Sequence, residues 1–238
     1  MLAGAGQAQV SPMYELPIDL DHTSGKYVPM LATAWKLDER APSYTVTLRK
    51  GVRFHGDWGE FTAHDMIHSF QQKAKEDSTG TPAVYLRQTI KEQSAPDDHT
   101  WVITLTRPDS NFLNYLSRRI YSAVAYSRKQ YAQTGDPDLN AVPPAGTGPY
   151  EFVAREPGGY IRFKRAAPEH WRINGDFQEI EVRFMKEAST RLAGLIANEV
   201  HLSNLPEDLV AQAERRGFKM IQGRVPAFWS RMWTVQRA

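Results

Sequence analysis

The chain has 238 residues, of which 41% are hydrophobic and 24% are charged, so it can bury the core of one large lobe or of two small ones. Its 29 basic and 27 acidic residues are intermixed and give a net charge of +2, a pattern that favours neither nucleic acid nor an anionic membrane surface as a partner. The absence of cysteine excludes disulfides, thiol catalysis and a lipid-bearing cysteine, and no apolar run approaches the length of a membrane span.

The N-terminal part of the chain shows little periodicity. Residues 1–10 (MLAGAGQAQV) have neither a basic start nor a long apolar run, so we expect no signal peptide within the chain. Between Tyr14 and Trp35 we predict a short helix followed by an irregular connection, because Asp, Gly and Pro are frequent there.

A strand and a tight turn are predicted next. Residues 44–49 alternate apolar and polar side chains, which is the period of a strand with one buried face. The turn at 56–59 contains two glycines and an aspartate, residues that tolerate unusual dihedral angles, and Phe54 and Trp58 supply two apolar rings to pin it.

A helix is expected directly after this turn. Thr62 is a suitable N-cap, and Asp65 three residues later places a carboxylate in the first helical turn, where free backbone N–H groups favour negative charge. The apolar residues Met66, Ile67 and Phe70 continue the helix.

Later segments give a mixture of strand and helix signals. We predict strands at 90–94, 100–106, 150–154, 160–165, 180–184 and 218–222, with hairpin turns at 96–98 and 157–159. We predict a helix after Pro108 with its apolar face at 112–116, a short helix capped by Ser127, helices at 189–198 and 206–216, and a loop at 136–149.

Several motifs together resemble one protein family. The strings LRKGVRFH (48–55) and FTAHD (61–65) resemble the pattern LRxGVxFHDGxPFTAxDV of the extracellular solute-binding proteins of the peptide and nickel type, the receptors of ABC importers. Further likenesses occur in the family's order: YEL at 14–16, PMLATAW at 29–35, DHTWV at 98–102, GTGPY at 146–150, HW at 170–171 and ASTRL at 188–192, continuing to NEV at 198–200. The turn between the first two strings has one extra residue and no proline, so its conformation departs from the family pattern.

The resemblance implies a fold. It predicts an α/β chain, a periplasmic-binding-protein-like type II lobe with mixed sheets and flanking helices. It also implies that residues 1–238 form an incomplete first lobe without the second. Within it, a subdomain at about 44–165 is expected between 11–43 and 166–238.

The resemblance also implies a function and partners. Family members close two lobes on a ligand, which predicts a solute-binding, mainly peptide-binding, component of an ABC transporter that is no enzyme and has no cofactor. The expected partners are a small-molecule or peptide ligand and a membrane permease, with no nucleic acid, and the complete protein is expected to be a monomer in the periplasm or outside the cell.

The candidate ligand-binding residues lie in three places. The first is Ser11, Met13 and Tyr14, and the second is His68, which follows the FTAHD helix start by about one turn; an exposed surface histidine is the alternative there. The third is the C-terminal segment 227–235, whose alternation places Trp229, Arg231 and Trp233 on one face, where rings and a guanidinium suit a peptide or a sugar. Core packing explains that face equally well.

Two alternative functions remain open at this point. His55, His64 and His68, with i, i+4 spacing between the last two, suit a metal-binding or metalloenzyme domain, although Asp65 stands where a HExxH motif has glutamate. The absent signal peptide also permits a cytoplasmic ligand-sensing module. Catalytic motifs are not found: no GxSxG occurs, and Pro149 follows the GTG string where a phosphate-binding helix would begin.

Overall fold

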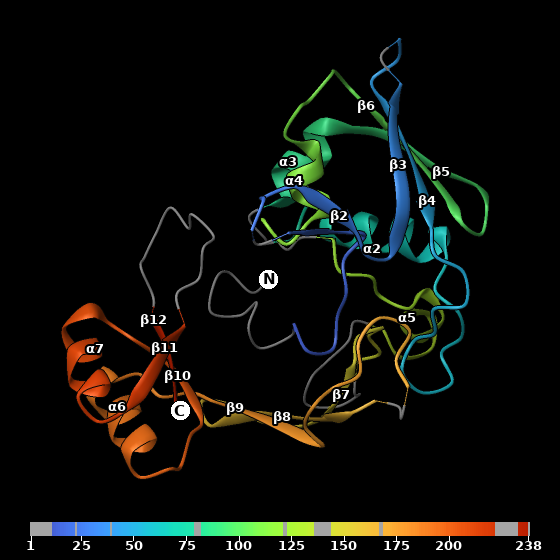
Figure 1. Cartoon of the computed structure of the whole chain (residues 1–238). Helices are drawn as coiled ribbons and strands as arrows, with labels where there is room; N and C mark the ends of the chain where they lie inside the picture. Colours follow the sequence, from blue (N-terminus) through green and yellow to red (C-terminus); the bar gives the residue numbers. More distant parts are fainter. Residues whose placement is uncertain are drawn as a thin grey trace. The chain divides into compact units, whose positions relative to one another are not determined.

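The computed structural model describes residues 11–21, 23–38, 40–78, 82–120, 123–135, 144–166, 169–221 and 233–237 (Figure 1). The chain divides into two compact units. Unit 1 comprises residues 1–21, 26–156 and 160–182, and unit 2 comprises residues 22–25, 157–159 and 183–238.

The centre of unit 1 is a four-stranded antiparallel sheet. Its strand order is β3 (Ala32–Asp38), β4 (Ser43–Leu48), β6 (Thr100–Leu105) and β5 (Ile90–Asp97). Alternate residues of β4 and β6 are buried, as the period-2 pattern predicts, and the largest of them is Trp101, which is fully buried. Helices α2 (Ala63–Lys73) and α3 (Pro82–Thr89) lie beside this sheet (Figure 1), where the Phe70 ring of α2 meets the Trp101 ring edge-on at 5.0 Å between centroids.

Helix α2 begins where the sequence predicts. The Asp65 carboxylate accepts hydrogen bonds of 2.9 Å from both the backbone N–H and the hydroxyl of Thr62, which satisfies free donors at the helix start. Its other oxygen accepts the backbone N–H of Arg128, at the first residue of α5 (Arg128–Thr134). One buried carboxylate therefore joins the starts of two helices.

Two smaller sheets complete unit 1. A three-stranded sheet has the order β7 (Tyr150–Glu156), β8 (Tyr160–Arg165) and β9 (Glu179–Arg183), and β1 (Ile18–Leu20) pairs with β2 (Tyr27–Pro29). The short helix α4 (Phe112–Leu116) contributes the buried Phe112, whose ring stacks on Tyr44 of β4 at 5.4 Å.

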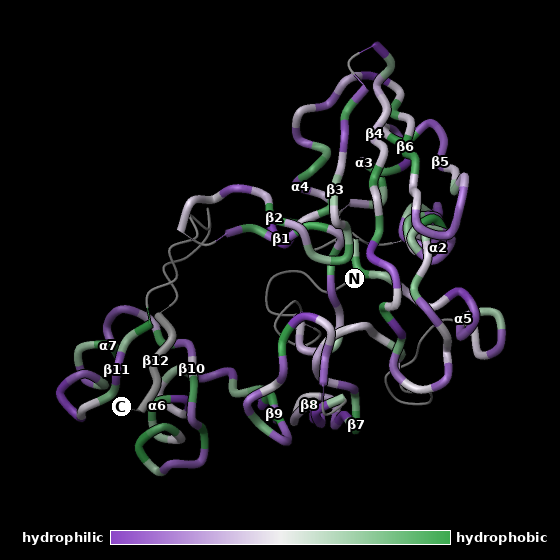
Figure 2. Tube along the Cα trace, turned by 45° about the vertical axis from the view of Figure 1, so that its right-hand side comes forward, coloured by the Kyte–Doolittle hydropathy of each residue, from purple (hydrophilic) through white to green (hydrophobic). Residues whose placement is uncertain are grey.

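Unit 2 has its own core. Its sheet places β12 (Trp233–Arg237) between β10 (Leu202–Leu205) and β11 (Phe218–Ile221), all antiparallel. Helices α6 (Ala188–Ile196) and α7 (Glu207–Glu214) supply most of the buried side chains, and Figure 2 shows apolar and polar residues mixed along both. The core consists of Leu192, Leu195, Leu205, Val210 and Ala213.

The structure confirms most of the predicted elements and corrects the N-terminal part. The predicted helix and irregular connection at 14–35 are wrong, because residues 14–16 are not helical and β1, β2 and the start of β3 follow them. Their hydrogen bonds explain the error: Leu31 N–H donates to the Leu16 carbonyl at 3.0 Å, a pairing with a distant residue that leaves no local periodicity. Helix α3 is a further element that the sequence patterns did not indicate.

Within the residues described, no helix combines the length and the apolar character needed to cross a membrane.

Candidate functional site

The candidate ligand-binding residues Ser11, Met13 and Tyr14 lie in a segment of unit 1, residues 11–16, that begins with a turn at 11–13 and that we call the N-terminal strap. Met13 is fully buried, Tyr14 is 8% exposed and Ser11 is half-buried. The strap forms backbone hydrogen bonds with the GTGPY segment at 146–150: the Met13 carbonyl accepts the N–H of Gly148 at 3.0 Å, and the Pro12 carbonyl accepts that of Tyr150 at 3.1 Å.

The two glycines of GTGPY make this pairing possible. A Cβ added at Gly146 would lie 1.8 Å from the Met13 carbonyl oxygen, and one added at Gly148 would lie 2.6 Å from the Pro12 carbonyl oxygen. Neither glycine has a positive φ. These positions therefore need glycine because the strap backbone comes so close, and the motif and the strap form a single structural feature.

His55 belongs to the same feature. Its Nε2 lies 2.7 Å from the Gly148 carbonyl oxygen, and its Nδ1 lies 3.3 Å from the Gly146 N–H, so the neutral ring donates from Nε2 and accepts at Nδ1. Burial lowers the pKa of His55, which favours this neutral form. Because both ring nitrogens are engaged, His55 has no lone pair left for a metal ion.

The other histidines of the predicted metal cluster lie elsewhere. His64 faces Asp98 at 3.7 Å between Nε2 and Oδ1, while the His68 ring packs edge-on against Tyr131 of α5 at 4.6 Å. In the described part of the chain, no three His, Cys, Asp or Glu side chains come together in a way that could hold a metal ion. The hypothesis of a site built by His55, His64 and His68 together is therefore wrong.

Tyr14 of the strap lies next to a second aromatic ring, which in turn contacts a buried amine. Its ring meets Tyr126 edge-on at 5.8 Å, and the Lys73 amine lies 4.7 Å from the centroid of the Tyr126 ring. Lys73 Nζ donates to the Val124 carbonyl at 2.8 Å, and burial lowers the pKa of Lys73 to about 7. Sequence reasoning missed both Lys73 and Tyr126, because neither stands in a motif.

Glu15 is a buried acid of the strap that the sequence marked only as part of YEL. Its side chain is 1% exposed, and its Oε1 accepts a hydrogen bond of 2.5 Å from Arg172 Nε. Burial raises the pKa of Glu15 to about 7, although Arg172 opposes the shift. The sequence offered one signal for this buried acid, because Glu15 stands among the apolar residues of the run MYEL.

The C-terminal candidates are only partly described. Trp229 and Arg231 lie outside the described residues. Trp233 is the first residue of β12 in unit 2, where its Cα pairs with that of Leu205, a member of the unit 2 core.

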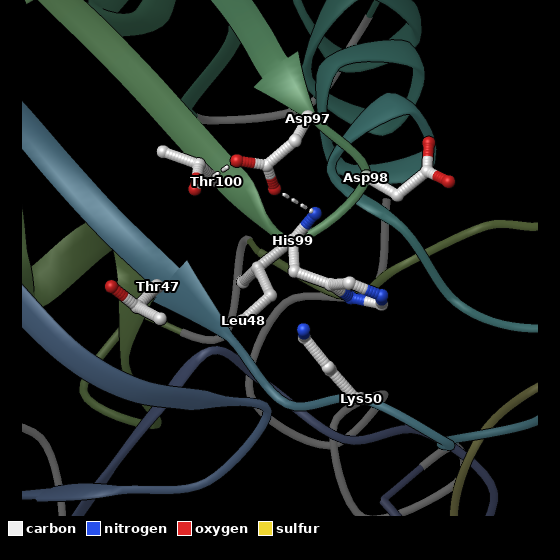
Figure 3. Close-up of a pocket in the computed structure, with 7 residues that line it drawn as sticks. All are labelled: Thr47, Leu48, Lys50, Asp97, Asp98, His99 and Thr100. Atoms are coloured by element: carbon white, nitrogen blue, oxygen red, sulfur yellow. Dashed lines mark hydrogen bonds between the residues drawn. The ribbon is translucent and has the colours of Figure 1, made fainter.

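A surface pocket of unit 1 contains none of the candidates. It has a volume of about 450 Å³ and is lined by Thr47, Leu48, Lys50, Asp97, Asp98, His99 and Thr100. Figure 3 shows the Lys50 amine and the His99 ring turned toward each other, while the Asp97 carboxylate accepts the N–H of His99 at 2.8 Å and the hydroxyl of Thr100 at 2.9 Å. Asp97 therefore builds the β5–β6 turn, as expected of an acid at that position.

The fold described above is that of a periplasmic binding protein. It matches the ABC transporter-associated periplasmic binding protein DppA from Helicobacter pylori in complex with the peptide STSA with a TM-score of 0.80 and 25% identity, over 93% of this chain and 47% of that chain. The predicted fold class, α/β with several sheets and flanking helices, is therefore confirmed.

The family follows from the sequence match. The family model described as "Bacterial extracellular solute-binding proteins, family 5 Middle" matches residues 26–236, and the chain belongs to this family. It is 28% identical over 214 residues to the dipeptide-binding protein of Escherichia coli (strain K12) and 29% identical over 221 residues to heme-binding protein A of Haemophilus influenzae. These matches cover 82% and 84% of this chain but 39% of each relative, so the chain spans about two fifths of their length.

Proposed function

We propose that the chain is part of the solute-binding component of an ABC importer and that its solute is a peptide or a similar small molecule. The observation that carries the proposal is the strap, which holds Met13 and Tyr14 against GTGPY in a chain of this family. The names of two relatives support the ligand class, since one is a dipeptide-binding protein and another was solved with the peptide STSA.

In this proposal the protein captures its solute in the periplasm by non-covalent binding, without catalysis. It then delivers the solute to a permease in the membrane. Capture by closure of two lobes makes the loaded form different in shape from the free form, so a permease can select it. The relatives are binding proteins, and the one from Helicobacter pylori is periplasmic and associated with an ABC transporter, which supports this role.

Photoaffinity labelling tests the proposal even when binding is weak. A short peptide with a photoreactive side chain, irradiated with the full chain, is expected to label residues 11–16, and excess unlabelled peptide is expected to prevent labelling. The Tyr14→Leu variant should lose most of the labelling because the ring beside Tyr126 is gone.

A matched control is Tyr160→Leu. Tyr160 is a half-buried tyrosine on β8 that contacts Arg162, and its replacement should leave strap labelling unchanged. Labelling that spares residues 11–16, or that is equal in the two variants, would contradict the proposed site.

A further inference from the structure

The strap is held by a side-chain contact in addition to its backbone pairing. Glu15, next to Tyr14, forms the ion pair with Arg172, and both residues lie in unit 1. Arg172 comes from the segment 169–175, which also contacts GTGPY, because His170 Nε2 donates to the Thr147 carbonyl at 2.8 Å. Three segments far apart in the sequence therefore meet at one buried carboxylate.

The charges around Glu15 leave Arg172 as its cationic partner. His170 Nε2 is 3.9 Å from Glu15 Oε2, but burial lowers the pKa of His170, and its Nδ1 accepts the N–H groups of Arg172 and Ile173. His170 is therefore neutral. Two further charged groups of the described chain flank the pair: Arg49 stacks on the Trp171 ring at 4.7 Å from its centroid, and Asp19, which forms an ion pair with Arg118 at 2.8 Å, also interacts electrostatically with Arg172.

The contacts of Glu15 compensate for its burial only in part. Arg172 donates to Oε1, and Trp171 and Thr147 also favour the charged carboxylate, but burial outweighs all three, so a full negative charge at this position is costly. A proton on Glu15 would relieve this cost.

We propose that Glu15 and Arg172 form a latch that positions Met13 and Tyr14, and that proton uptake by Glu15 sets how firmly the strap is held. The position of Glu15 beside Tyr14 links the latch to the proposed ligand site, and this link rests on the proposed function. Glu15 is a positioning residue in this scheme.

The direction of the pH effect follows from linkage. In the attached strap the pKa of Glu15 is about 7, whereas a released strap exposes the carboxyl to water, where its pKa returns to the ordinary value of 4.5. Between these values the attached form binds more protons, so attachment is firmest at low pH and weakens as the pH rises to about 7. The largest possible change in the opening equilibrium is roughly 300-fold.

Amide hydrogen exchange of the full chain measures this opening directly. The amides of Gly148 and Tyr150 donate to the strap carbonyls, so they exchange when the strap detaches. After correction for intrinsic rates, their opening is expected to increase at least tenfold from pH 5 to pH 8, while the amides of β4 and β6 serve as reference. The Glu15→Gln variant should abolish this increase because its side chain does not titrate, and His55 and His170, whose pKa values are lowered by burial, change the opening in the opposite direction.

Two further variants separate the latch from a general structural role. Arg172→Met leaves the Glu15 carboxylate buried without its cationic partner, so the opening at pH 8 should increase about tenfold. In the double variant with Glu15→Gln no buried charge remains, so the protection of the two amides should be restored. As a control, Arg162→Met breaks the Arg162–Glu181 pair of 2.7 Å and should leave the exchange of Gly148 and Tyr150 unchanged.

The outcomes distinguish this inference from the proposed function. A wild-type opening that does not vary with pH, or a Glu15→Gln variant that keeps the variation, overturns the latch whatever the labelling shows. If the exchange profile is as expected but the photoreactive peptide spares the strap, the latch stands and the proposed ligand site fails.

Discussion

At the scale of single residues, the buried amine of Lys73 offers the sharpest prediction. Its folded-state pKa of about 7 lies below the ordinary 10.5, so the unfolded chain binds more protons between these values and the free energy of unfolding rises with pH there. Replacing Lys73 by Met removes the cost of the buried charge. The Lys73→Met variant should therefore gain stability relative to wild type at pH 6 and lose this advantage by pH 10, with a change of a few kcal/mol.

Urea unfolding at pH 6, 8 and 10 measures the Lys73 effect. Lys164→Met is the control, because the Lys164 side chain is 56% exposed and its ion pair with Glu151 lies at the surface. A stability difference between Lys73→Met and wild type that stays constant across this pH range would contradict the expected titration.

At the scale of elements, the start of α2 depends on Asp65. Its carboxylate accepts two donors of Thr62 and the backbone N–H of Arg128, so Asp65→Ala leaves donors at the starts of both α2 and α5 without their acceptor. The expected loss is about 2–4 kcal/mol.

Thermal and urea unfolding give the size of the Asp65 effect. Asp65→Asn keeps an acceptor oxygen and should recover part of the loss, while Asp77→Ala, at an exposed position beyond the end of α2, should change the free energy of unfolding by less than about 0.5 kcal/mol. Equal losses for Asp65→Ala and Asp77→Ala would show that the carboxylate does not organise the helix starts.

Elements of this kind could be predicted from the sequence because their causes are local. The alternation in β4 and the pairing of Thr62 with Asp65 are contained in a few neighbouring residues. The strap could not be predicted in this way, since its conformation is set by carbonyls that accept hydrogen bonds from Gly148 and Tyr150. For the same reason the sequence indicated Tyr14 as a site residue but missed Glu15, whose role depends on Arg172.

At the scale of the whole molecule, the length of the chain bears on affinity. The chain spans 39% of the dipeptide-binding protein of Escherichia coli and 47% of the solved relative from Helicobacter pylori, while each of its two units has secondary structure of its own. Two expectations from the family resemblance remain predictions: a subdomain at about 44–165 and the closure of two lobes on the ligand. If the ligand of a complete receptor also contacts residues beyond those of this chain, the chain supplies only part of the binding free energy.

The 238-residue chain is therefore expected to bind peptides weakly or not at all. A micromolar complex corresponds to about −8 kcal/mol, and halving the favourable contacts leaves about −4 kcal/mol, which is a millimolar dissociation constant. Isothermal titration calorimetry with a mixed dipeptide library should therefore give little heat, whereas the Escherichia coli dipeptide-binding protein titrated in parallel shows that the library contains ligands. A micromolar or tighter dissociation constant for this chain would refute the prediction, and loss of that binding in Tyr14→Leu would show that the residues of this chain suffice for tight binding and that Tyr14 takes part in it.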